Sequence, residues 1–171
     1  MLNRIIGVFK LDVNTFEEIE HDQNATGQAA LIVLVIGLLS GIGQGIVGDS
    51  FVSGLIVGLL STLAGWVIWS AVTYFVGTSL FKGQADMGEM LRVIGFAYSP
   101  QILGIIPCLG QVIGAIWTLV AGFVAVRQGL DLDNTKAALT IGIGFVAYLV
   151  IFFIIGLFLG GAGLALNAIT G

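Results

Sequence analysis

The sequence carries little charge for its length. Among 171 residues, six are Lys or Arg and ten are Asp or Glu, so that charged residues make up only 9% of the chain. Hydrophobic residues make up 57%, and the mean hydropathy is +1.07. This composition excludes an ordinary soluble domain, which needs a charged surface. The net charge of -4 also argues against nucleic-acid binding, which requires a basic surface.

Residues that commonly build catalytic and metal sites are scarce as well. The single cysteine, Cys108, excludes an intramolecular disulfide and a cysteine-based metal cluster. The single histidine, His21, lies among acidic residues. No His, Asp or Lys lies inside an apolar run, where it could activate a nucleophile. We therefore expect no enzymatic activity, no catalytic residues, no cofactor and no metal site.

One acidic cluster precedes the first apolar run. Its members are Glu17, Glu18, Glu20, His21 and Asp22. Such a cluster could hold a cation weakly, but clusters of this kind are more often solvated helix faces, and we interpret it as one.

Long apolar runs cover residues 28–48, 51–81, 91–106, 111–126 and 137–159. A spanning helix needs about 20 mostly apolar residues, so these runs predict an all-α integral membrane protein, a bundle of five transmembrane helices. If the runs cross the membrane in alternating directions, every basic residue lies on the same side of the membrane, namely Arg4, Lys10, Lys82, Arg92, Arg127 and Lys136. Because short cytoplasmic loops are enriched in Lys and Arg, we predict the N-terminus inside and the C-terminus outside.

The first residues form a separate, amphipathic part. Leu2, Ile5 and Phe9 recur at helical spacing, so we divide the chain into an interfacial segment, 1–26, and a membrane domain, 27–171. Asn14 with Glu17 predicts a helix start inside this segment.

Similar signals predict where the membrane helices begin. Asp86 with Glu89 predicts the start of the third, and Glu89 could also pair with Arg92. Ser50 is expected to cap the second helix, and Asp133 or Asn134 the last.

The chain contains 26 glycines, several of them four residues apart. Small residues at this spacing allow helix backbones to approach closely. We expect packing inside one molecule, with homo-oligomerisation or binding of another protein as the alternative. The candidate packing glycines are Gly41, Gly45, Gly54, Gly58, Gly110 and Gly114.

Pro100 interrupts the third apolar run and predicts a kink, because proline lacks the backbone donor that the carbonyl of Phe96 needs. In lipid that carbonyl must find another partner. Side chains of Ser99, Gln101 or Gln44 could repair the kink. With Tyr98, the polar groups at this level also form a candidate site for a lipid headgroup or a permeant, namely Gln44, Tyr98, Ser99, Pro100 and Gln101.

Three stretches carry a family resemblance: Gly-Phe-Ala-Tyr-Ser-Pro from Gly95, Ile-Pro-Cys-Leu-Gly from Ile106, and Gly-Leu followed by Lys-Ala, from Gly129 to Ala137. With them, the chain resembles the Yip family of polytopic membrane proteins, and in particular its short prokaryotic members. The resemblance implies five spans with a cytoplasmic N-terminus and location in a prokaryotic plasma membrane.

Eukaryotic Yip proteins with a longer cytosolic region are linked to Rab-type GTPases. We do not expect Rab binding here, because residues 1–26 are too few for a separate domain. The expected function is non-enzymatic: membrane organisation, or a scaffold or adaptor that acts through helix packing, lipids or protein contacts. The alternative is a small channel or transporter that uses the polar site of the third span.

Overall fold

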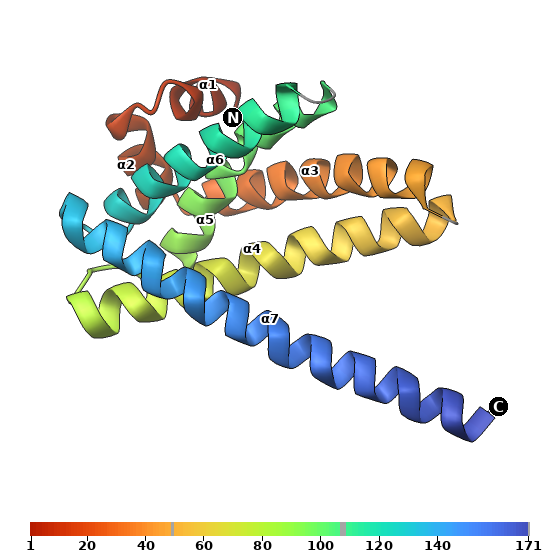
Figure 1. The fold of residues 1–171 in the computed structure, drawn as a ribbon. Helices are drawn as coiled ribbons and strands as arrows, with labels where there is room; N and C mark the ends of the chain where they lie inside the picture. The colour runs from red at the N-terminus through yellow and green to blue at the C-terminus, as the bar shows by residue number, and fades with distance from the viewer. Residues whose placement is uncertain (49, 107–108, 171) are drawn as a thin grey trace.

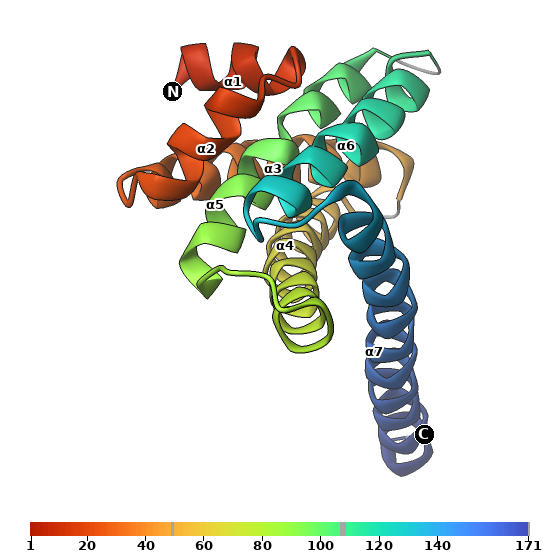
Figure 2. The same ribbon diagram turned by 90° about the vertical axis from the view of Figure 1, so that its left-hand side faces the viewer.

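A computed structural model describes the backbone of residues 1–48, 50–106 and 109–170, and the side chains of these residues except 47 and 159–170. This described part is helical throughout and contains no strand (Figures 1 and 2). In chain order the elements are α1 (Leu2–Phe9), α2 (Val13–His21), α3 (Ala25–Val47), α4 (Phe51–Phe81), α5 (Met87–Ala97), the 3-10 helix η1 (Ser99–Ile105), α6 (Leu109–Gln128) and α7 (Asn134–Thr170).

Local capping explains where several helices begin. The predicted capping box of α5 is confirmed, since Asp86 and Glu89 each accept a hydrogen bond from the other's backbone N–H. Ser50 caps α4, as predicted, by accepting from the backbone of Ser53. At α7, Asp133 accepts from the N–H of Lys136 at 2.9 Å.

The predicted start of α2 is wrong. Asp12, not Asn14, is its N-cap, and its carboxylate accepts from the Asn14 N–H and the Thr15 hydroxyl. Asp12 is itself a strong capping residue, and it stands two positions earlier in the chain.

Within the described residues, four helices are long and apolar enough to cross a membrane: α3, α4, α6 and α7. The third predicted span is not one of them, so five membrane-length helices are not observed. Its residues form α5, which has 11 residues, and η1, which has seven. Pro100 lies in the first turn of η1. The chain tightens into 3-10 geometry there, because proline cannot donate within a continuing α-helix. The predicted interruption at Pro100 thus takes the form of a change from α-helical to 3-10 geometry.

The helices form a bundle with one outlying member. Helices α3 and α4 form an antiparallel hairpin, η1 packs along α6, and the short helices α1 and α2 lie against α5 and α6 (Figures 1 and 2). Helix α7 contacts α4 and α6 near its start and then diverges toward the C-terminus (Figure 1). The buried core centres on α2 and α5, with Phe16, Ile19, Met90 and Phe96 fully enclosed.

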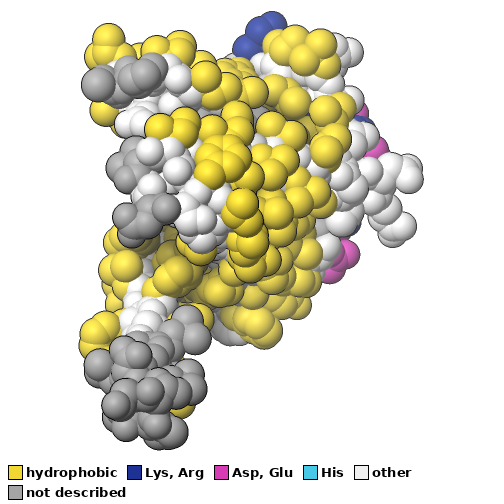
Figure 3. Space-filling model, turned by 90° about the vertical axis from the view of Figure 1, so that its right-hand side faces the viewer, with side chains coloured by type: hydrophobic (Ala, Val, Ile, Leu, Met, Phe, Trp, Pro, Cys, Tyr) yellow, Lys and Arg dark blue, Asp and Glu magenta, His cyan; other side chains and the backbone are white. Residues whose placement is uncertain are grey.

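The outer surface is apolar. Figure 3 shows a face dominated by hydrophobic side chains, with charged groups at its margins. Large residues on α3, α4, α6 and α7 are widely exposed, for example Ile46, Leu119 and Phe153 at about 70%. This arrangement suits a protein whose surroundings are hydrocarbon rather than water.

Glycines set the distance between α3 and α4. A Cβ added to Gly58 would lie 2.3 Å from the Cα of Gly41, and one added to Gly54 would lie 2.4 Å from the Cα of Gly45. These four glycines therefore place two backbones in direct contact inside one molecule. At the other hairpin, a Cβ on Gly110 would meet the carbonyl oxygen of Leu103 at 2.1 Å, and one on Gly114 would meet that of Pro100 at 3.0 Å.

Candidate functional site

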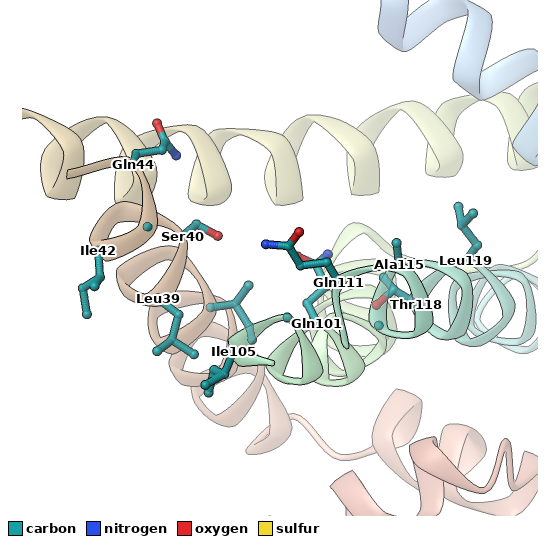
Figure 4. Close-up of a pocket in the computed structure, with 14 residues that line it drawn as sticks. Leu39, Ser40, Ile42, Gln44, Gln101, Ile105, Gln111, Ala115, Thr118 and Leu119 are labelled. Carbon is teal, nitrogen blue, oxygen red and sulfur yellow. The ribbon is translucent and has the colours of Figure 1, made fainter. Parts of the chain in front are cut away.

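A cavity of about 880 Å³ lies between α3, η1 and α6 (Figure 4). Three amide side chains contribute to its wall, one from each element: Gln44, Gln101 and Gln111. Figure 4 shows the Gln111 amide pointing across the cavity toward Ser40 on α3. The remaining wall is mainly apolar and contains two hydroxyl residues: Ile36, Leu39, Ser40, Ile42, Gly43, Gly104, Ile105, Gly114, Ala115, Thr118 and Leu119.

A second cavity, of about 480 Å³, lies on the other side of Gln101. Its wall comes from α4, α5, η1, α6 and α7, and it includes the aromatic residues Trp69, Tyr98 and Tyr148. The rings of Trp69 and Tyr148 meet edge to face at 5.6 Å between centroids. Gln101, Thr118 and Leu119 line both cavities. These residues thus form a wall that the two cavities share.

The sequence-predicted polar residues are only partly brought together. Gln44 and Gln101 line the first cavity, and Tyr98 and Gln101 line the second. Ser99 and Pro100 are buried and line neither cavity. In the described residues, no side chain of Gln44, Ser99 or Gln101 donates to the carbonyl of Phe96, so the expected repair of the kink is not observed.

Three cavity residues were missed from the sequence: Ser40, Gln111 and Thr118. Each lies in an otherwise apolar helix, and only the packing of α3 and α6 against η1 shows that they face one space. A polar residue in an apolar span is the signal that could have found them.

The chemistry of the two cavities is neutral. Within the described part of the chain, neither wall contains Asp, Glu, Lys, Arg or His. Amides both donate and accept hydrogen bonds. The hydroxyl oxygen of Thr118 is buried and has no partner among the described residues, so the amides, and not this hydroxyl, are the groups that a guest could reach. Such a wall can hold a neutral polar group, but it supplies no acid, base or nucleophile pair for catalysis.

A polar network fastens α2 to the bundle. Arg92 is buried and donates from Nε and Nη2 to the backbone carbonyl of Glu20, at 2.9 and 2.5 Å. The expected pairing of Arg92 with Glu89 is therefore wrong, because Glu89 serves the cap of α5. The Gln128 amide donates to the Glu17 carboxylate. Helix α2 is thus bound to both α5 and α6.

Glu20 contradicts the interpretation of its cluster as a solvated helix face, since it is 4% exposed. Burial, and then the carboxylates of Glu17 and Asp131, raise the pKa of Glu20 to about 7. Asp22 behaves oppositely: its hydrogen bond from Arg4, at 2.6 Å, lowers the pKa of its carboxyl. The cluster therefore contains both a half-buried carboxylate paired with Arg4 and a poorly compensated buried one.

Two tryptophans also join distant elements. The indole of Trp66 donates to the carbonyl of Leu91 at 3.0 Å, and that of Trp117 donates to the carbonyl of Phe9 at 2.9 Å. Trp66 is buried and so belongs to the bundle interior rather than to an aromatic belt.

Comparison with known proteins gives one match. A family model of the Yip1 domain matches residues 6–163, which include every element from α2 to α6 and both cavities. The chain belongs to the Yip1 family. No curated protein and no solved structure matches it. The membership and the four membrane-length helices together make this Yip1 protein an integral membrane protein with several spans.

Proposed function

We propose that this Yip1 protein is a non-enzymatic membrane-organising protein that binds a lipid in the amide-lined cavity beside η1. One observation carries the proposal: a cavity with three amides opens among exposed apolar side chains. Its wall includes Ile105 and Leu119, which are 60% and 72% exposed. Hydrocarbon chains can lie along such residues while the polar part of the lipid bonds to the amides.

The position of the amides favours the glycerol and ester region of a lipid. Gln44 is three residues from the end of α3, and Gln111 is two residues after the start of α6. Both therefore lie within about one helical turn of a hairpin tip, near the edge of the hydrocarbon layer. Ester carbonyls at that depth accept from amide N–H groups, and neither group carries a charge.

We propose a topology of five crossings, with the N-terminus in the cytoplasm of a prokaryotic cell. The third crossing is made by α5 and η1 together. Eleven α-helical residues and seven 3-10 residues extend about 16 and 14 Å, which together match a hydrocarbon thickness of about 30 Å. The side with Lys82 and Lys136 is then cytoplasmic, because the end of α4 and the first turn of α7, where these residues lie, are opposite the two hairpin tips (Figure 1).

The lipid hypothesis is tested with matched Gln-to-Leu variants. Gln101→Leu should reduce the amount of phospholipid that remains bound to the purified protein in native mass spectrometry. Gln84→Leu makes the same change at an exposed loop position and should leave it unchanged. Equal lipid retention by both variants and the wild type would contradict the hypothesis, provided that all three keep the same helical content.

A channel or transporter is the second candidate, and the shared wall of the two cavities favours it. If Gln101 and Thr118 form a gate between compartments, liposomes containing the protein should show flux of small neutral solutes, and Gln101→Leu should abolish it. Lipid retention without flux supports the organising role, and flux without lipid retention supports transport.

A further inference from the structure

Three potential metal ligands project from one face of α2. Glu17, Glu20 and His21 stand at positions i, i+3 and i+4, a spacing that places side chains side by side on a helix. One ligand atom from each lies within 4.8 Å of the other two. Their helix lies outside the four membrane-length helices, so the cluster is at the polar end of the bundle.

The carboxyl group of Glu20, the buried member of this cluster, has no oppositely charged partner among the described residues. Glu20 is 4% exposed, and its Oε2 has no hydrogen-bond partner among the residues that the structure describes. The guanidinium of Arg92 donates to the backbone carbonyl of Glu20 rather than to its carboxylate. The ion pairs found in the described part of the chain involve other carboxylates. A buried carboxylate is costly unless it binds a proton or is paired with a cation, so a cation bound here would take the place of the proton.

The other two side chains are already oriented. Nδ1 of His21 donates to the carbonyl of Glu17 at 2.9 Å, because a carbonyl can only accept. That bond leaves Nε2 with its lone pair for a metal when the ring is neutral. The amide of Gln128 holds the Glu17 carboxylate from α6. Hydrogen bonds of this kind fix the ligands of metal sites in proteins.

We propose that Glu17, Glu20 and His21 bind a divalent transition-metal ion, with Zn²⁺ as the expected occupant. One imidazole and two carboxylates are a donor set that suits Zn²⁺ better than Mg²⁺ or Ca²⁺, which prefer oxygen alone. Water completes the coordination. Ligand atoms bonded to Zn²⁺ at about 2.0–2.1 Å stand about 3.4 Å apart, so the side chains close slightly on binding. This revises the expectation, drawn from the sequence, that the cluster is a solvated face without a metal.

The ion would lock the N-terminal helices onto the bundle. The backbone of Glu20 is tied to Arg92 on α5, and the side chain of Glu17 is tied to Gln128 on α6. A metal held between the two carboxylates therefore links Glu20, which is bonded to α5, with Glu17, which is bonded to α6. The site is independent of the lipid cavity, whose wall contains none of these residues.

The test titrates Zn²⁺ into the purified full chain in detergent, after chelation of any metal carried through purification. Calorimetry should show one Zn²⁺ per chain, with Mg²⁺ giving no comparable heat. Glu20→Gln and His21→Ala should each weaken Zn²⁺ binding at least about tenfold, as should loss of the orienting amide in Gln128→Ala. Glu18→Gln removes the same charge from the same helix, at a side chain 60% exposed, and should bind Zn²⁺ like the wild type.

Replacement of Zn²⁺ by Co²⁺ gives a second readout that does not depend on stability. A Co²⁺ absorption spectrum should appear with the wild type and Glu18→Gln and be lost in His21→Ala, which alters an exposed side chain. Absence of Zn²⁺ binding to the wild type would overturn the proposal. Unchanged binding in His21→Ala would overturn it too, even if Glu20→Gln failed to fold.

Discussion

The contact between α3 and α4 allows a graded prediction from three Gly-to-Ala variants. A Cβ at Gly58 would lie 2.3 Å from the backbone of Gly41, and one at Gly41 would lie 2.8 Å from the backbone of Leu55. A Cβ at Gly43, on the same hairpin, would meet nothing within 4 Å. Since ordinary contacts begin near 3.4 Å, Gly58→Ala must push the helices apart by about 1 Å, and Gly41→Ala by about half as much.

These distances predict how the three variants rank in their free energy of unfolding. Overpacking costs about 1–3 kcal/mol, and replacing a helical glycine with alanine returns up to about 1 kcal/mol. With the full penalty, Gly58→Ala should lower the free energy of unfolding by about 2 kcal/mol. Gly41→Ala should lower it by less, because its contacts are longer. Gly43→Ala should raise it slightly, because it gains helix propensity without a contact.

The ranking of the three variants in stability is measured by thermal unfolding in the same detergent, followed by far-ultraviolet circular dichroism. For a chain of this size, 2 kcal/mol corresponds to a midpoint lowered by about 4–8 °C. The reasoning would be refuted if Gly58→Ala and Gly43→Ala had the same midpoint. An intact midpoint for Gly58→Ala would mean that the hairpin is looser than its backbone distances indicate.

Two further predictions concern topology and the interior. In a Cys108→Ser background, a membrane-impermeant thiol reagent applied outside should label a cysteine placed at Ser50 and should not label one placed at Gln84. Labelling at Gln84 from outside would contradict the proposed orientation. Trp66→Phe should destabilise the protein by about 1–3 kcal/mol, because it leaves the carbonyl of Leu91 without its donor inside the bundle. Chemical denaturation should show this loss of stability. A variant as stable as the wild type would show that water replaces the indole.

Much of the local structure could be predicted because its determinants are close in sequence. The capping box of α5 needs only Asp86 and Glu89, and the interruption of the third run needs only Pro100. The error at α2 arose from the same kind of information, since Asp12 and Asn14 are both capable caps. The proline predicts a lost hydrogen bond in the α-helix, whereas the continuation of the chain as a 3-10 helix over seven residues is seen only in the structure.

The candidate site could be predicted only in part. Gln101 attracts attention because it follows the proline, and Gln44 because it is polar in an apolar run. Their meeting with Gln111 and Thr118 in one wall depends on how α3, η1 and α6 pack together. The spacing of these residues along the chain does not encode that packing.

By itself, the sequence determined that this protein is helical, lies in a membrane and carries its basic residues outside the long apolar runs or at their ends. Apolar run length and charge position decide these properties, because the bilayer acts on each segment separately. Only the tertiary structure decided that Gly58 faces Gly41, that Arg92 bonds to Glu20, and that the carboxylate of Glu20 is buried beside His21. The first two contacts join residues distant in the chain. The energies of all three depend on burial and on distances of a few ångströms, which exist only once the helices have packed.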